Sequence, residues 1–274
     1  MPVTRTATAL LRASHLPPTV AVTAFAGAYA WGVGASAGLA ARVALAVLAG
    51  QLSVGWSNDW IDATRDSAVG RSDKPVATGA VRTTTVRTAA FVAAAACVVL
   101  SFALGPAAGV VHVVAVASAW AYNAGLKATP WSWAPYALSF GLLPSVATLA
   151  LDDASLAPVS TTVAAALLGV GAHLANVLPD LEDDAATGVV GLPHRLGRRG
   201  TTIGAVALLL AAAALVVLTT PDGPTPAGLA ALALAVALAA SAAWVAARRP
   251  DRRYPFLAAI GVAAVSVVVL VTTA

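Results

Sequence analysis

Long apolar segments constrain this sequence more than any other feature. The 274 residues are 59% hydrophobic and 10% charged, with a mean hydropathy of +0.84, whereas a soluble domain carries about 25% charged residues. Segments of about 20 apolar residues can cross a bilayer as helices, and continuous rather than alternating runs favour helices over strands. We therefore expect one all-α domain over residues 1–274, a polytopic membrane protein with nine transmembrane helices at 17–33, 36–57, 86–104, 106–122, 131–151, 158–179, 201–219, 225–246 and 255–272.

The positive charges fall almost entirely on one side of these segments. Fifteen of the 16 Lys and Arg residues lie before the first predicted helix, in loops on the same side or, for Arg87, at the start of the helix that follows such a loop, and only Arg42 lies elsewhere. The positive-inside rule assigns that side to the cytoplasm, with the N-terminus, in the cell membrane. Membrane topology thus accounts for the pI near 9.7, and the expected partner is the lipid bilayer, not nucleic acid. A single cysteine, Cys97, excludes an intrachain disulfide or a cysteine metal cluster.

Two acidic stretches align without a gap at an offset of 118 residues. The first, at 58–79, is NDWIDATRDSAVGRSDKPVATG, and the second, at 176–197, is NVLPDLEDDAATGVVGLPHRLG. The same offset carries Gly105-Pro106 onto Gly223-Pro224. We infer that predicted helices 2–5 and 6–9 are related by an internal parallel repeat around a central cavity. Because four helices separate equivalent points, both acidic stretches should open on the cytoplasmic side.

Each acidic stretch places polar side chains along one helix face. Residues four apart share a face, so Asn58, Asp62 and Asp66 form one stripe and Asn176, Asp180 and Asp184 form its counterpart. Neighbouring carboxylates destabilise a helix unless a cation neutralises them, and Mg²⁺ takes carboxylate and phosphate oxygens. Ordinary solvated charges at helix ends are the alternative. The stripes predict Mg²⁺ with a diphosphate between them, and the candidate ligands are Asn58, Asp59, Asp62, Asp66, Asp180, Asp183 and Asp184.

Several motifs together resemble the UbiA superfamily of intramembrane prenyltransferases. They are N-D-x-x-D-x-x-x-D at 58–66, Asp73-Lys74-Pro75 with Gly79, the Tyr122 to Lys127 segment, and D-x-x-x-D at 180–184. The resemblance covers essentially the whole chain. It implies that the two aspartate motifs bind Mg²⁺ and a polyprenyl diphosphate whose lipid tail enters a cavity among the helices. The family often spaces its Tyr and Lys as Y-x-x-x-K, whereas Tyr122 and Lys127 are five residues apart.

The resemblance also implies roles for individual residues. Loss of pyrophosphate from an allylic carbon develops negative charge, which metal ions and cationic side chains stabilise. The residues expected to act in catalysis are Asp62, Asp66, Asp180, Asp184 and Lys127. Those expected to bind the substrate are Asn58, Arg65, Arg71, Lys74, Tyr122, Asn123, Asn176 and Arg195. His15 and His173 could contact an acceptor or serve only in packing.

Three functions fit these features. The first is transfer of a prenyl group from a prenyl diphosphate to a small aromatic or quinone-precursor acceptor. The second is a terpene cyclase of the same superfamily, in which a double bond of the same chain quenches the cation. The third is a transporter, which we rank low because its charges should lie near the middle of the membrane.

Overall fold

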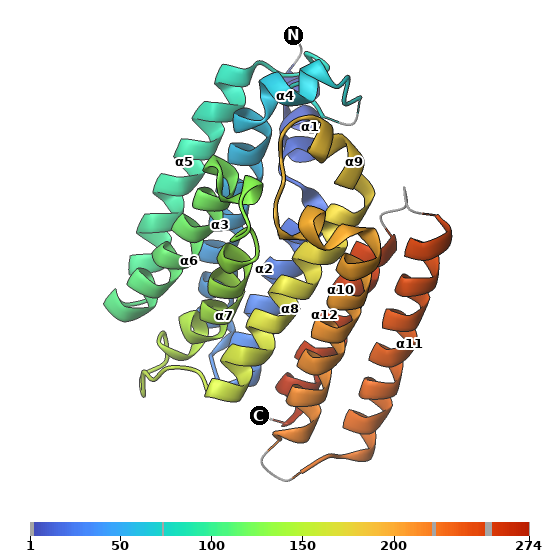
Figure 1. Cartoon of the computed structure of the whole chain (residues 1–274). Helices are drawn as coiled ribbons and strands as arrows, with labels where there is room; N and C mark the ends of the chain where they lie inside the picture. Colours follow the sequence, from blue (N-terminus) through green and yellow to red (C-terminus); the bar gives the residue numbers. More distant parts are fainter. Residues whose placement is uncertain (1–2, 73, 221–222, 250–253, 274) are drawn as a thin grey trace.

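The computed structural model describes residues 3–72, 74–220, 223–249 and 254–273, and the regular elements in these residues are all helices. Asp73 of the first motif lies outside the described residues. The longer α-helices run along a common direction, and short helices lie at one end of the bundle (Figure 1). The elements are α1 (Val3–Ala13), α2 (Leu16–Gly32), α3 (Ala37–Ile61), α4 (Ala63–Ala68), α5 (Thr83–Phe102), α6 (Pro106–Ala124), η1 (Leu126–Ala128), α7 (Ala134–Thr148), α8 (Val159–Val177), η2 (Leu178–Asp180), α9 (Leu181–Ala186), α10 (Leu192–Leu218), α11 (Pro226–Arg248) and α12 (Tyr254–Thr273).

The nine predicted segments each overlap one of these helices, but only part of the set has the length of a membrane span. Within the described residues, seven helices are long and apolar enough to cross a bilayer: α3, α5, α6, α8 continuing into α9, α10, α11 and α12. The other two are shorter, with 17 residues in α2 and 15 in α7. At 1.5 Å per residue α7 reaches about 22 Å, less than the roughly 30 Å of a hydrocarbon core. The protein is therefore a multi-pass membrane protein, while the count of nine spans stays a prediction.

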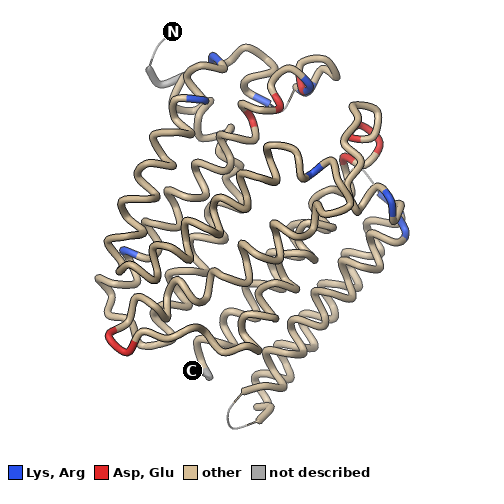
Figure 2. The backbone as a smooth tube through the Cα atoms, turned by 60° about the vertical axis from the view of Figure 1, so that its left-hand side comes forward, with Lys and Arg blue, Asp and Glu red and all other residues tan. Residues whose placement is uncertain are grey.

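Two apolar cores flank the centre of the bundle. One is formed by α2, α3 and α7 around Val43, Val47 and Val146. The other is formed by α8, α10 and α12 around Leu209 and Val262. Charged residues are confined to the bundle ends: most described Lys and Arg residues lie at the end that carries the N-terminus (Figure 2). This separation leaves the long helix surfaces apolar, as a bilayer requires.

The local backbone conformation of the first acidic stretch recurs 118 residues further along the chain, at the offset found in the sequence. The short helices α4 and α9 begin and end 118 residues apart. Glycines with left-handed φ angles come in three pairs at this offset, Gly70 and Gly188 at 69° and 82°, Gly79 and Gly197 at 72° and 66°, and Gly105 and Gly223 at 120° and 79°. Glycine adopts such angles without the steric cost that other residues meet. These are local matches, and the repeat of the two halves of the bundle stays a prediction.

The helix α1 was not predicted from the sequence, because its eleven residues contain no long apolar run. It packs on the end of α3, where the indole Nε1 of Trp56 donates a hydrogen bond of 2.8 Å to the carbonyl of Leu10. The chain then turns sharply at His15, whose φ of 54° and ψ of 58° lie in the left-handed region. A Cβ on Gly55 would lie 2.5 Å from the carbonyl oxygen of Ser14. The missing side chain of Gly55 therefore lets this turn lie directly against α3.

Candidate active site

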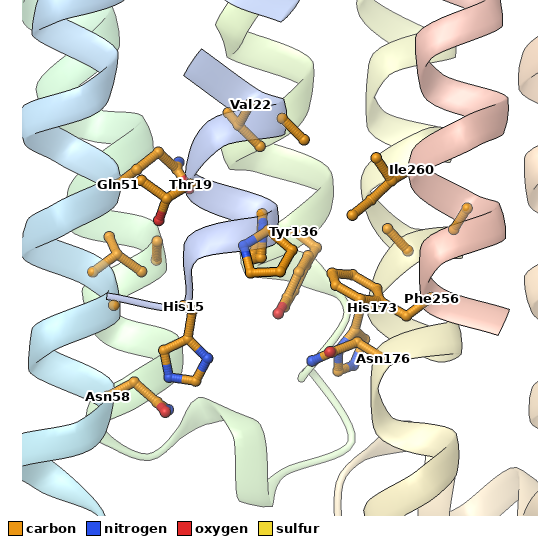
Figure 3. Close-up of a pocket in the computed structure, with 18 of the residues that line it drawn as sticks. His15, Thr19, Val22, Gln51, Asn58, Tyr136, His173, Asn176, Phe256 and Ile260 are labelled. Carbon is orange, nitrogen blue, oxygen red and sulfur yellow. The ribbon is translucent and has the colours of Figure 1, made fainter. Parts of the chain in front are cut away.

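A chamber of about 1100 Å³ lies among α2, α3, α7, α8 and α12, and both acidic stretches line one end of it. Figure 3 shows His15 and Asn58 facing Tyr136 and Asn176 across this space. Fourteen of the predicted site residues line the chamber: Asn58, Asp59, Asp62, Arg65, Asp66, Arg71, Lys74, Tyr122, Asn123, Lys127, Asn176, Asp180, Asp183 and Asp184. Arg195 does not line the chamber; its side chain is exposed to solvent near the start of α10.

Asp62 is the most heavily hydrogen-bonded carboxylate of the first stretch. It lies at the junction of α3 and α4 and is 5% exposed. Lys127 Nζ lies 2.5 Å from both of its oxygens. Arg65 and Asn58 each donate a further hydrogen bond of 3.1 Å to Oδ2. The carboxylate is therefore held in one orientation by donors from three directions, in a region that excludes most water.

Lys127 belongs to η1, the short turn after α6, and its side chain is 10% exposed. Burial lowers the pKa of Lys127, because removal from water disfavours the ammonium form, and the charge of Asp62 acts in the opposite direction. The backbone around it is also constrained, since a Cβ on Gly191 would lie 2.5 Å from the Lys127 carbonyl oxygen. The part of the second acidic stretch that precedes α10 thus packs against the segment that carries Lys127.

Asp66 lies one turn beyond Asp62 on α4 and is 3% exposed. Arg65 Nη2 is 3.7 Å from its Oδ1, and its Oδ2 is buried without a hydrogen-bond partner. Burial raises the pKa of Asp66, while the charge of Lys74 lowers it. A buried carboxylate oxygen with no donor is costly unless a cation approaches it. This oxygen therefore fits a hard metal ion.

Two arginines connect the acidic stretches. Arg65 lies 3.9 Å from Asp184 while it also binds Asp62, and Arg71 lies 3.4 Å from Asp180. The second stretch is more open than the first, with the side chains of Asp180 and Asp184 31% and 19% exposed. The two stripes therefore face each other, as the sequence led us to expect. Among the described residues no three His, Cys, Asp or Glu side chains converge as a metal-binding group, and the carboxylates of Asp62 and Asp180 pair instead with Arg65, Lys127 and Arg71.

Asp59 lies deeper in α3 and pairs with a different cation. It is 1% exposed, and its Oδ1 accepts a hydrogen bond of 2.6 Å from Lys74 Nζ. His15 Nε2 lies 3.2 Å from the same oxygen and 3.1 Å from Lys74 Nζ. Lys74 Nζ also donates to Asn58 Oδ1 at 3.3 Å. The unpredicted turn at His15 thus places an imidazole directly beside two predicted site residues.

Asn123 is engaged mainly with α3. Its amide nitrogen donates to the carbonyl of Val54 at 2.9 Å and to Ser57 Oγ at 2.8 Å, and its oxygen accepts from Asn58 at 3.3 Å. Since both ends of its amide are already bonded within the protein, Asn123 holds Asn58 in place. Its predicted contact with substrate stays a prediction.

Aromatic side chains form the wall opposite α3. Tyr136 stacks on His173 with 4.5 Å between ring centroids, and Tyr122 meets His173 edge to face at 5.5 Å. His173 is 1% exposed, with Nε2 3.2 Å from Ser132 Oγ and Nδ1 without a hydrogen-bond partner. Such faces favour positive charge. Below the ionic end, the chamber therefore offers aromatic and apolar surface.

Some residues of the chamber were missed or misassigned from the sequence. His194 lines it, whereas the neighbouring Arg195 points to solvent, because α10 begins with Leu192 and turns successive side chains to different faces. Gln51, outside both acidic stretches, and Ser72, within the first stretch, also line the chamber and were not among the predicted site residues. If the start of α10 at Leu192 had been known, its helical periodicity would have shown that His194 and Arg195 lie on different faces of the helix.

This geometry defines a class of protein: a membrane-embedded helical bundle with an acidic and basic mouth above an apolar chamber, suited to a ligand with an anionic head and a lipid tail. The sequence model of the UbiA prenyltransferase family matches residues 19–267. Because this match covers most of the chain, the protein belongs to the UbiA prenyltransferase family. None of the curated proteins compared with it matches.

Solved structures share the fold at low sequence identity. A UbiA homologue from Aeropyrum pernix, solved without ligand, has a TM-score of 0.76 at 18% identity, covering 93% of this chain and 97% of its own. A UbiA homologue from Archaeoglobus fulgidus, bound to DMAPP and Mg²⁺, has a TM-score of 0.67 at 16% identity, covering 95% and 98%. A digeranylgeranylglyceryl phosphate synthase has a TM-score of 0.67 at 14% identity, covering 98% of each chain.

Proposed function

We propose that this protein is an integral membrane, Mg²⁺-dependent prenyltransferase. It ionises a polyprenyl diphosphate and transfers the prenyl group to a small aromatic or quinone-precursor acceptor. The observation that carries this proposal is the pair of carboxylate stripes joined by Arg65 and Arg71 at one end of an apolar chamber. The alternative within the family is a cyclase, which uses the same ionisation without an acceptor.

The carboxylates fit the metal ions that this chemistry uses. Asp62 and Asp66 on one side, and Asp180 and Asp184 on the other, would hold Mg²⁺, with Asn58, Asp59 and Asp183 near enough to assist. The buried, unpartnered Oδ2 of Asp66 supports this assignment, as does the Archaeoglobus homologue solved with Mg²⁺ and DMAPP. When bound, Mg²⁺ neutralises negative charge that develops on the leaving diphosphate.

The cationic side chains act on the same charge. Arg65, Arg71, Lys74 and Lys127 all line the ionic end of the chamber and can donate hydrogen bonds to phosphate oxygens. The C–O bond of the allylic diphosphate breaks, pyrophosphate leaves with the electron pair, and a carbocation remains on the prenyl chain. Positive groups fixed at the leaving oxygens lower the barrier to this step.

The remainder of the chamber protects and stabilises the carbocation. Apolar walls keep water away from it, and the faces of Tyr122 and Tyr136 stabilise its positive charge. Asn58, Asn123 and Asn176 are the neutral polar groups that orient the diphosphate or the acceptor. The acceptor attacks the cationic carbon, a new bond forms, and the acceptor gives up a proton.

The proposed topology follows from the charge distribution. We infer nine membrane spans, with α2 and α7 completing the set, and two units of four spans related by a parallel repeat in a single domain. The basic end of the bundle, with the N-terminus and the active site, faces the cytoplasm of the cell. The charge distribution in Figure 2 and the paired local conformations at an offset of 118 residues support this arrangement.

Purified protein in lipid nanodiscs, given geranyl, farnesyl or geranylgeranyl diphosphate with Mg²⁺, tests the proposal. Pyrophosphate release that depends on hydroxylated aromatic acceptors, with a prenylated product by mass spectrometry, is the expected result. A cyclic hydrocarbon formed without acceptor would identify the cyclase instead. Uptake of substrate into proteoliposomes without pyrophosphate release would refute both and revive the transporter.

A further inference from the structure

Gln51 is a polar side chain in the apolar part of the chamber. It lies near the middle of α3 and lines the chamber, seven residues before Asn58. Seven residues are two turns of helix, so Gln51 faces the same space as Asn58 about 10 Å deeper in the bundle. Figure 3 shows Gln51 and Asn58 on one wall of the chamber, with His173 and Asn176 on the opposite wall.

The amide of Gln51 is not used within the described part of the protein. Gln51 is half-buried, and no hydrogen bond joins its side chain to another described residue. Two hydroxyls that line the chamber outside the acidic stretches already donate to backbone, Thr19 to the Ser14 carbonyl at 2.7 Å and Ser139 to the Ala115 carbonyl at 2.8 Å. An unbonded amide in apolar surroundings is unfavourable. The position of Gln51 therefore suits a ligand that supplies the missing hydrogen bonds.

The opposite wall is apolar at this depth. On α8 the residues that line the chamber between Thr161 and His173 are all Ala or Leu. On α12 the lining residues are Phe256, Leu257, Ala259, Ile260, Ala263, Val267 and Leu270. Leu257 is 51% exposed, so this wall is open at its edge and sets no limit on the length of a lipid chain. This wall suits a prenyl chain, whereas the wall of Gln51 suits a ligand with polar groups.

Charged groups lie only at the other end of the chamber. Among the described residues that line it, the Asp, Lys and Arg side chains belong to α1, to η1 or to the two acidic stretches. A carboxylate two helical turns below them would lose water without gaining a cation, which is strongly unfavourable. An amide, by contrast, can donate to a carbonyl or hydroxyl oxygen and can accept from a hydroxyl.

We infer that Gln51 binds the acceptor through an uncharged hydroxyl or carbonyl group, so that the acceptor is a neutral phenol or quinol and not a carboxylate. The acceptor then lies against α3, and the prenyl chain lies against α8 and α12. This inference rests on the proposed function and names the chemical class of its acceptor.

Pairs of phenols with and without a carboxylate test this inference. The pairs are methyl 4-hydroxybenzoate with 4-hydroxybenzoate, and 2-naphthol with 6-hydroxy-2-naphthoate. Each acceptor is given to the protein in nanodiscs with geranyl diphosphate and Mg²⁺, and initial rates of pyrophosphate release yield kcat/KM. In the unmodified protein we expect the uncharged member of each pair to have a kcat/KM at least about tenfold higher, because the charged member has no cation beside Gln51.

Two substitutions at Gln51 separate hydrogen bonding from charge. Gln51→Met keeps the length of the side chain but removes its hydrogen bonds, so KM for the uncharged acceptors should rise about tenfold. Gln51→Arg places a cation at the same point and should shift the kcat/KM ratio toward the carboxylates by at least about tenfold. Leu45→Met is the matched control, because Leu45 lies on α3, is 52% exposed and does not line the chamber.

Calorimetry with geranyl thiolodiphosphate and Mg²⁺ reports the donor site separately. Both Gln51 variants should bind this non-ionisable analogue as the unmodified protein does, which also shows that they have folded. Carboxylates used as well as their uncharged partners, or an acceptor KM that Gln51→Met leaves unchanged, overturns the inference. So does binding of the analogue without pyrophosphate release from any of the four acceptors. If the analogue does not bind with Mg²⁺, the proposed function itself fails.

Discussion

Replacement of Asp62 by asparagine separates the chemical role of this residue from its role in packing. Asp62→Asn keeps the shape of the side chain but removes the negative charge that faces Lys127, Arg65 and, under the proposed function, a metal ion. Losing one group that stabilises developing charge in a protected site typically costs about 10²- to 10³-fold in turnover, roughly 3 to 4 kcal/mol. We therefore expect pyrophosphate release to fall by at least that factor.

The same variant should fold. Lys127, with a side chain 10% exposed, loses its carboxylate partner, and an unsatisfied buried donor costs about 1 to 3 kcal/mol of stability. Thermal unfolding followed by tryptophan fluorescence should show a single transition at a reduced temperature, while a continuous coupled assay reports pyrophosphate. Asp153→Asn is the matched control, because Asp153 is exposed and lies in the loop between α7 and α8, away from the chamber lining. Release at the unmodified rate in both Asp62→Asn and Asp180→Asn would refute the metal assignment.

Three further expectations concern the metal, the turn at Ser14 and the buried lysine. EDTA should stop pyrophosphate release and added Mg²⁺ should restore it; activity that survives exhaustive chelation contradicts the assignment. Gly55→Ala should lower stability by about 1 to 3 kcal/mol, since its Cβ meets the Ser14 carbonyl, whereas Gly38→Ala on the same helix has no atom within 4 Å and should not destabilise; equal melting temperatures would refute this. Lys127→Met should lower turnover of the prenyl diphosphate by at least about tenfold while the protein stays folded, because a buried apolar chain replaces the cation that, under the proposed function, binds phosphate; unchanged steady-state kinetics would count against this role.

The sequence was most informative where rare residues stand out against an apolar background. Asn, Asp and Gly-Pro are scarce among so many Ala, Val and Leu residues, so the two acidic stretches could be recognised, and the structure places them on the same chamber. Helix positions followed from hydropathy because the bilayer demands continuous apolar runs.

Other features of the structure depend on contacts between residues far apart in the chain, and no local sequence pattern predicted them. The turn that brings His15 to Asp59 depends on Gly55, forty residues further along the chain. The choice between His194 and Arg195 depended on where α10 begins, which a one-residue error reverses. Apolar length alone could not show that α2 and α7 are shorter than a typical span, since apolar residues such as Val33 and Leu149 continue the chain beyond the last turn of each helix.

The charge pairs also relate the two ligands that the proposed function requires. Asp62 cannot fully coordinate a metal ion while it is paired with Lys127. In the same way, Lys127 cannot donate fully to a phosphate oxygen while its Nζ lies 2.5 Å from Asp62. Separating this pair makes both groups available at once. Binding of either ligand separates the pair and so raises the affinity for the other ligand, and linkage requires the two factors to be equal. Either substitution, Asp62→Asn or Lys127→Met, removes this shared step, so their effects on turnover should overlap rather than multiply in the double variant.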